Sequence, residues 1–97
     1  MTIEKNLNGT ELTVTITGRL DTTTAPQLEA EFKQNINGVE KLVLDFASLE
    51  YLSSAGLRVL LAQKVMNKQG EMIIKNVNET INEIFEVTGF IDILTIE

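Results

Sequence analysis

Hydrophobic and polar positions alternate strictly near the start of the chain. From Leu12 to Ile16 the apolar residues are separated by threonines, which predicts a strand with one buried and one polar face. Residues 2–7 precede this segment, and Asn8-Gly9 lies between the two. We therefore expect a β-hairpin with a tight type I′ turn, because both central residues of that turn need positive φ.

The apolar spacing then changes from two residues to the three or four of a helix. Thr24 followed by Gln27 is a capping-box pattern, and Pro26 suits a first helical turn. Asn37-Gly38 marks the end of this helix. Its apolar positions are Ala25, Leu28, Phe32 and Ile36.

The middle of the chain predicts two further strands around a second helix. Residues 39–46 are dense in apolar and β-branched side chains, as in a central strand, and residues 47–52 are expected to form a turn. We expect a helix from about Ala55 to Lys68, followed by a strand at 71–75.

The last segment predicts a third helix and a short extended end. Asn78 can cap a helix that stops near Gly89, and residues 90–96 are expected as a last strand or an extended tail. The order β-β-α-β-α-β-α-β, with short connections, predicts one compact α/β domain over residues 1–97.

The amino-acid composition argues against several classes of function. The chain has 97 residues with a net charge of −6, from 14 acidic and 8 basic side chains, which argues against a nucleic-acid or anionic membrane surface. The absence of cysteine excludes a disulfide scaffold, and the absence of histidine removes the usual general base and metal ligand. No run of about 20 apolar residues and no signal-peptide core is visible, so we expect a cytoplasmic protein without membrane contact of its own.

The sequence YLSSAGLRVLL, residues 51–61, delivers two serines to the start of the second helix. A serine at this position is ordinarily an N-cap, but capping needs only one of them. Gly56 weakens the first turn, by up to about 1 kcal/mol relative to alanine. A glycine there is explained if another molecule approaches the backbone closely.

Helical-wheel positions divide this second helix into two faces. An apolar arc that includes Ala55, Leu57 and Val59 is predicted to face the sheet. Gln63 and Lys64 oppose that arc. Leu60 falls among these polar residues and is therefore predicted to be exposed and available to a partner, and Arg58 is expected in the exposed first turn.

Three blocks of sequence, in this order, resemble the STAS domain of stand-alone bacterial anti-sigma factor antagonists. They are GRLDTTTAPQLE, KLVLDFASLEYLSSAGLRVLL and GEMIIKNVNETINEIFEVTGF. The resemblance runs from about residue 3 to residue 95. It implies a four- or five-stranded mixed sheet with helices packed mainly on one face.

The resemblance also implies the site residues. The phosphorylation motif of the family, Asp-Ser-Ser/Thr-Gly, aligns with SSAG, so that the phosphoacceptor falls on Ser54 and the aspartate on Ser53. Ser53 is the second choice of acceptor. Asp45, at the end of the central strand, is expected to support the serine loop through hydrogen bonds. The partner-binding residues implied are Asp21, Thr22, Thr23, Ser53, Ser54, Gly56, Leu57, Arg58 and Leu60.

The function implied is that of a binding protein without catalytic residues, metal or cofactor. Its unphosphorylated form would bind an anti-sigma factor serine kinase and free the sigma factor. The kinase would use its own ATP and Mg²⁺ to modify Ser54, and a PPM-type serine phosphatase would reverse the modification.

Other interpretations stay open. The same fold serves as a docking subunit of transport or stress-signalling assemblies, in which Ser54 would carry no phosphate. Phosphorylation of Asp45, as in a response-regulator receiver, would need an acidic pair after the first strand and a lysine on the last strand, and neither is present. A nucleotide-binding role lacks a glycine-rich phosphate loop.

Overall fold

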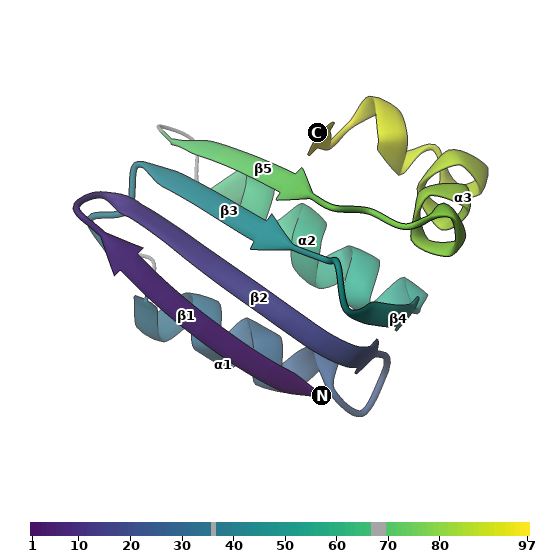
Figure 1. Ribbon diagram of the computed structural model, residues 1–97, viewed down its shortest axis with the longest axis horizontal. Helices are drawn as coiled ribbons and strands as arrows, with labels where there is room; N and C mark the ends of the chain where they lie inside the picture. The colour runs from purple at the N-terminus through teal and green to yellow at the C-terminus, as the bar shows by residue number, and fades with distance from the viewer. Residues whose placement is uncertain (36, 67–69) are drawn as a thin grey trace.

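A mixed β-sheet organises the molecule, and the computed structural model describes residues 1–35, 37–66 and 70–97. The strands follow the order β1-β2-β3-β5-β6, and β4 pairs with β2 outside this path (Figure 1). The elements are β1 (Thr2–Asn8), β2 (Glu11–Leu20), α1 (Ala25–Asn35), β3 (Lys41–Asp45), β4 (Leu49–Leu52), α2 (Ser54–Met66), β5 (Glu71–Lys75), α3 (Glu79–Thr88), the 3₁₀ helix η1 (Phe90–Asp92) and β6 (Thr95–Ile96). Ile36 and Lys68, which the sequence assigns to helices, lie outside the described residues.

The β1-β2 hairpin forms as expected but with a different turn. Asn8 pairs with Glu11, so Gly9 and Thr10 are the central residues. Gly9 has a φ of +64°, whereas Thr10 is not among the described residues with positive φ. This fits a type II′ turn, in which only the first central residue needs positive φ. The predicted type I′ turn at Asn8-Gly9 is therefore wrong by one position.

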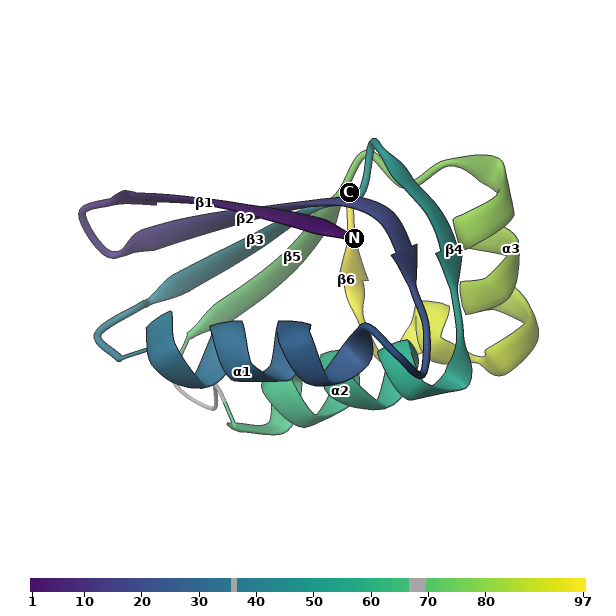
Figure 2. The ribbon, with the colours of Figure 1, turned by 90° about the horizontal axis from the view of Figure 1, so that it is seen from below.

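The helices lie mainly on one face of the sheet. Figure 2 shows α1 and α2 side by side beneath the strands, while α3 stands at one end beside β4. Among the described strands, β1 and β2 pair antiparallel, and the other pairs are parallel. The expected mixed sheet with helices mainly on one face is confirmed, but it has six strands where four or five were expected.

Two elements differ from the sequence expectation. Residues 49–52 form strand β4 instead of part of a turn, with Leu49 and Leu52 buried and the two residues between them exposed. This burial pattern does not alternate, so the four-residue segment carries no strand periodicity. Residues 90–96 form the short helix η1 and then only a two-residue strand, because Gly89 takes the left-handed conformation and redirects the chain.

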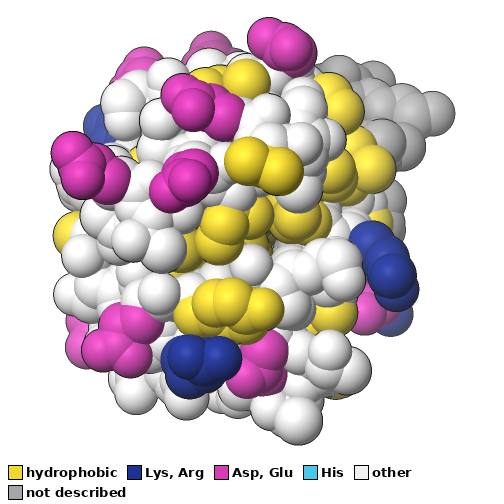
Figure 3. Space-filling model, turned by 90° about the vertical axis from the view of Figure 1, so that its right-hand side faces the viewer, with side chains coloured by type: hydrophobic (Ala, Val, Ile, Leu, Met, Phe, Trp, Pro, Cys, Tyr) yellow, Lys and Arg dark blue, Asp and Glu magenta, His cyan; other side chains and the backbone are white. Residues whose placement is uncertain are grey.

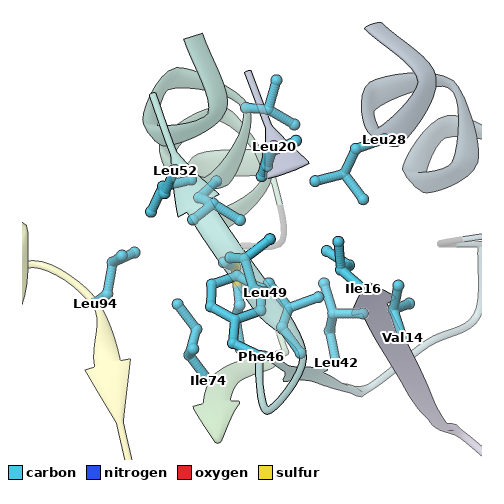
Figure 4. Packing of buried hydrophobic residues seen from close by; sticks show 14 of the residues in the cluster. Val14, Ile16, Leu20, Leu28, Leu42, Phe46, Leu49, Leu52, Ile74 and Leu94 are labelled. Atoms are coloured by element: carbon cyan, nitrogen blue, oxygen red, sulfur yellow. The ribbon is translucent and has the colours of Figure 1, made fainter. Parts of the chain in front are cut away.

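The core fills the space between the sheet and the two covering helices. Figure 4 shows leucine, isoleucine, valine and phenylalanine side chains from β2, β3, β4, β5 and α1 pointing into one cluster. At the end of this cluster Leu20 of β2 and Leu52 of β4 are register partners and are almost completely buried. Burial of each such side chain stabilises the fold by about 1.5–3 kcal/mol. The loops that follow these two leucines therefore start from fixed positions.

Candidate functional site

Two loops meet where β2 and β4 end. The strands are parallel, with Arg19 opposite Tyr51 and Leu20 opposite Leu52, so both chains leave the sheet at the same edge. The N–H of Ser53 donates to the carbonyl oxygen of Leu20 at 2.9 Å, which extends the pairing one residue farther. The Asp21 loop and the serine loop are thereby held next to each other, although Asp21 and Ser53 are 32 positions apart in sequence.

Asp21 organises the first of these loops. Its Oδ1 accepts hydrogen bonds from the Thr23 hydroxyl at 2.7 Å, the Thr23 N–H at 3.0 Å and the Thr24 N–H at 3.2 Å. The Thr23 hydroxyl is the main reason why the pKa of the Asp21 carboxyl lies below its ordinary value. Asp21 is half-buried, whereas Thr22 and Thr23 are exposed. Its carboxylate acts as a turn and cap residue ahead of α1.

The two serines of the second loop differ in their surroundings: Ser53 caps α2, and Ser54 is exposed. Ser53 precedes α2, its carbonyl oxygen accepts from the Leu57 N–H at 3.0 Å, and its Oγ lies 3.5 Å from the Gly56 nitrogen. Ser54 is the first residue of α2 and is exposed. Within the described part of the chain the Ser54 hydroxyl makes no hydrogen bond. The helix is capped at Ser53, which leaves the Ser54 hydroxyl accessible to another molecule.

Gly56 serves the core of the domain. It is buried, and a Cβ added there would lie 2.7 Å from Leu20 Cγ and 2.7 Å from Leu52 Cδ1. The helix backbone approaches these two leucines so closely that any side chain would overlap with them. The interpretation that Gly56 leaves room for a partner molecule is therefore wrong.

The predicted orientation of α2 is wrong in part: Leu57 and Val59 are buried as the apolar arc predicts, but the polar face is not where it was expected. Leu60 is fully buried and Leu57 is 4% exposed, so neither lies on the surface as a partner-binding residue. Gln63, predicted to face solvent, is buried as well, whereas Ala62 is exposed. Apolar residues occur on all sides of this helix, so its sequence does not select one face. The close contact at Gly56 selects the face instead, and it turns Leu60 and Gln63 inward.

Asp45 supports a different loop from the one expected. Its Oδ1 accepts from the Ala47 N–H and from the Asn76 side-chain amide, both at 3.0 Å. Asp45 is opposite Thr15 of β2, and β4 joins β2 only from Gly18 to Leu20. Five residues of strand, roughly 16 Å, therefore separate Asp45 from the level of the serine loop. Asp45 ties the turn after β3 to the loop after β5 and does not hold Ser54.

The structure adds Arg19 and Tyr51 to the site. The Arg19 guanidinium lies 4.4 Å from the centre of the Tyr51 ring, and its Nε is 3.8 Å from Asp21 Oδ2. Both residues occur in the motifs that carry the family resemblance, but only the pairing of β2 with β4 brings them together. Arg58, one turn after Ser54 on α2, is exposed as expected.

Several of these side chains lie exposed at the same end of the sheet. No group of three or more His, Cys, Asp or Glu that could hold a metal ion occurs among the residues that the structure describes. In those same residues, none of the helices has the length and apolar character needed to cross a bilayer. The exposed members of the site are Thr22, Thr23, Tyr51, Ser54, Arg19 and Arg58.

Comparisons with known proteins show the family of the chain. A family model described as the STAS domain matches residues 2–97. BtrV of Bordetella bronchiseptica, whose name describes a proposed anti-sigma factor antagonist, is 38% identical over 82 residues, which cover 81% of this chain and 71% of BtrV. The anti-sigma F factor antagonist of Paenibacillus polymyxa is 30% identical over 89 residues, which cover 88% of this chain and 76% of that protein.

The fold agrees with solved structures of SpoIIAA. The unphosphorylated form of this anti-sigma factor antagonist has a TM-score of 0.78 at 17% identity, with 99% of this chain and 87% of SpoIIAA covered. The phosphorylated form from Bacillus has a TM-score of 0.77 at 18% identity, with 99% and 91% covered. At these identities the likeness shows the fold. With a family model matching nearly its whole length, this chain belongs to the STAS domain family.

Proposed function

We propose that this protein is an anti-sigma factor antagonist whose activity is switched by phosphorylation of Ser54. In its unmodified form it binds an anti-sigma factor that is also a serine kinase, and so frees the sigma factor. The observation that carries the proposal is the exposed Ser54 hydroxyl, without an internal hydrogen bond, at the start of α2 and beside the Asp21 loop. The names of the relatives BtrV and the Paenibacillus polymyxa antagonist support the same role.

The position of Ser54 allows a phosphate without unfolding the domain. A phosphoserine adds about 1.5 to 2 negative charges at neutral pH. The first turn of a helix carries unpaired N–H groups and the positive end of the helix dipole, both of which favour an anion. Ser54 is the first residue of the 13-residue helix α2, and α2 has no acidic residue in its first turn to repel the phosphate. The fold of the protein is therefore expected to survive the modification.

The same charge would prevent binding at an interface. A partner surface that fits a neutral hydroxyl would have to bury an uncompensated phosphate, at a cost of several kcal/mol. A loss of about 4 kcal/mol weakens affinity roughly a thousandfold. One phosphate is therefore enough to release the partner, with no conformational change inside this protein.

The chemistry of the switch belongs to the partners. The kinase supplies ATP and Mg²⁺, and a PPM-type serine phosphatase removes the phosphate. This chain is the substrate and binding partner, acting in the cytoplasm without a cofactor of its own. Ser53, which stands where the motif of the family has an aspartate, favours a second candidate, a docking subunit without a phosphate switch.

The test compares four forms of the full chain: wild type, Ser54→Ala, Ser54→Asp and Ser48→Asp. Ser48 is an exposed serine in the turn before β4, so Ser48→Asp adds the same charge away from the serine loop. Each form is used to capture proteins from the lysate of the native organism, followed by mass spectrometry and phosphosite mapping.

If the proposal is correct, wild type, Ser54→Ala and Ser48→Asp each capture a small serine kinase, and Ser54→Asp does not. Phosphate is then found on Ser54 of the wild type, and its appearance depends on ATP. Equal recovery of the kinase by Ser54→Asp and wild type would contradict the switch. Recovery of a transporter or scaffold subunit by all four forms would support the docking subunit instead.

A further inference from the structure

The acidic residues are distributed unevenly along the chain. Residues 76–97 contain five of the 14 acidic residues and none of the 8 basic ones, so they hold −5 of the net charge of −6. Among the described residues, only Glu97 of this segment pairs with a cation, Lys75 at 3.9 Å. The carboxylates of Glu79, Glu83, Glu86 and Asp92 have no cationic partner in that part of the chain. The end of the molecule formed by α3 and η1 therefore carries an uncompensated negative charge.

The same end exposes apolar side chains. An open hollow on the outside of α3 is lined by Thr80, Glu83, Ile84, Val87 and Thr88, and we call this surface the α3 outer face. Val87 is 80% exposed, and of the five large hydrophobic residues that are exposed in the described structure, three belong to residues 87–93. Figure 3 shows hydrophobic side chains gathered in a band on this side of the molecule, with acidic side chains beside its upper part and Lys or Arg side chains at its lower end and right edge.

The stability of α3 does not explain this arrangement. Ile81 and Phe85 already bury the inner side of the helix. Glu83 lies four residues after Glu79 and three before Glu86, spacings at which like charges repel. Glu86 also lies in the last turn, where α3 has no basic residue and where the helix dipole disfavours an anion. Glu79 in the first turn is favoured by the helix dipole, and Glu86 accepts a hydrogen bond from the Asn82 side-chain amide at 3.2 Å. Glu83 has no such partner among the described residues, so contacts inside the domain do not explain its charge.

From this combination we infer that the α3 outer face is a second docking surface, and that it binds a basic amphipathic helix of a partner protein. An apolar stripe on that helix would cover Ile84 and Val87, and flanking lysines or arginines would pair with Glu83 and Glu86. A second copy of this chain would bring the same negative charge to the contact. Nucleic acids and anionic membranes are repelled for the same reason.

The docking surface is separate from the phosphorylation site. The 10 residues of α3 span about 15 Å, which matches about three turns of a partner helix. None of the residues of the α3 outer face belongs to the Asp21 loop or the serine loop. Binding at α3 is therefore expected to persist in Ser54→Asp, so the two proposals can fail independently.

The experiment uses the full chain and a synthetic 14-residue peptide that repeats Leu-Lys-Lys-Leu-Leu-Lys-Leu twice. Binding is followed by changes in backbone amide NMR shifts at low salt. The control peptide carries glutamate in place of every lysine. Two variants are compared, Val87→Lys on the α3 outer face and Leu7→Lys at the far end of β1, where Leu7 is 62% exposed. Both variants replace an exposed apolar side chain and change the net charge equally.

The inference expects shift changes confined to residues 79–93, and binding that weakens as salt is raised. Val87→Lys is expected to weaken binding about tenfold, since it removes an apolar contact and adds a like charge, and Leu7→Lys less than about twofold. Equal effects of the two variants, equal binding of the glutamate peptide, or shift changes spread over other acidic regions would overturn it. A dimer of the free chain that Val87→Lys dissociates would also overturn it, because the occupant would then be a second copy.

Discussion

The N–H of Ser53 donates to the carbonyl oxygen of Leu20 at 2.9 Å, and this hydrogen bond joins the two loops of the site. Ser53 precedes α2 directly, and Leu20 precedes the Asp21 loop directly. The start of α2 is therefore held by the end of β2, and Ser54 is presented on a rigid base.

Replacement of the two serines should separate capping from display. Ser53→Ala removes the Oγ that lies 3.5 Å from the Gly56 nitrogen, and we expect a loss of about 0.5–1 kcal/mol in the free energy of unfolding. Ser54→Ala should change stability by less than about 0.5 kcal/mol, because the Ser54 hydroxyl is exposed and unbonded within the described chain. Urea unfolding measures both. If Ser54→Ala loses more stability than Ser53→Ala, then Ser54, and not Ser53, caps α2.

Gly56→Ala should destabilise the domain although alanine favours helices. The gain in helix propensity is at most about 1 kcal/mol. The added Cβ would lie 2.7 Å from both Leu20 Cγ and Leu52 Cδ1, and such overpacking typically costs about 1–3 kcal/mol. Thermal or urea unfolding measures the net loss. In a Leu20→Ala background the cost of Gly56→Ala should shrink, and an unchanged cost would show that the contact with Leu20 is not its cause.

The Asp21 carboxyl should titrate at a lower pH than an ordinary aspartate. Thr23→Ala removes the hydroxyl that contributes most to the lowered pKa, so the Asp21 pKa is expected to rise in that variant. NMR of the Asp21 carboxyl carbon follows the titration. Thr22→Ala is the matched control, because Thr22 makes no hydrogen bond to Asp21. An equal shift in both variants would show that the Thr23 hydroxyl is not responsible.

The sign of the associated stability change follows from that lowered pKa. A carboxyl whose pKa is lower in the folded state stabilises the fold above its unfolded pKa of about 3.9. This contribution is lost as the pH falls through the folded pKa. Asp21→Asn should therefore lose stability relative to wild type near neutral pH, and the difference should diminish below about pH 4. Urea unfolding from pH 7 to pH 3 measures it.

Asp45→Ala should reduce stability without changing partner affinity. The substitution removes the acceptor of two hydrogen bonds, from the Ala47 N–H and the Asn76 amide, which we expect to cost about 1–2 kcal/mol. Asp45→Asn keeps one acceptor oxygen and should retain part of this energy. Unfolding and kinase binding are measured on the same samples. Weaker binding by fully folded Asp45→Ala would restore the view that Asp45 supports the serine loop.

Phosphoserine incorporated at position 54 should interact with Arg58. The two positions are four residues apart on α2, and Arg58 is exposed with no ion-pair partner in the described chain. An ion pair at this spacing contributes about 0.2–0.5 kcal/mol, so Arg58→Gln should raise the second pKa of the phosphate, about 6, by roughly 0.2–0.4. Phosphorus NMR follows the titration. Lys64→Gln is the control. An equal phosphate pKa in the two variants would contradict an ion pair between the phosphate and Arg58.

The sequence was sufficient where a single local signal determines the structure. Asn78 caps α3 through its Oδ1 and the Ile81 N–H at 2.9 Å, and Gly89 ends the helix with a φ of +80°, as their positions predict. Hydrophobic alternation likewise predicted β2, which is buried at Leu12, Val14 and Ile16. These signals depend only on neighbouring residues.

The orientation of α2 required contacts between distant residues. Leu60 and Gln63 are buried because Gly56 packs against Leu20, 36 residues earlier in the chain. The same holds for the serine loop, whose position depends on a parallel pairing of β4 with β2 that no periodicity in residues 49–52 predicts. The motif indicates the exposure of Ser54, but nothing in it indicates the contact of Arg19 with Tyr51.

The shared strand β2 also has a consequence for how the chain folds. β2 pairs with β3 over residues 11–15 and with β4 over residues 18–20. During synthesis the Ser54 surface therefore cannot assemble until β4 has left the ribosome and found the end of β2. An isolated peptide of residues 51–61 lacks that strand, so we expect it to compete poorly with the folded protein for a partner. A kinase that recognises this surface would thus act on completed domains and ignore unfinished or unfolded copies.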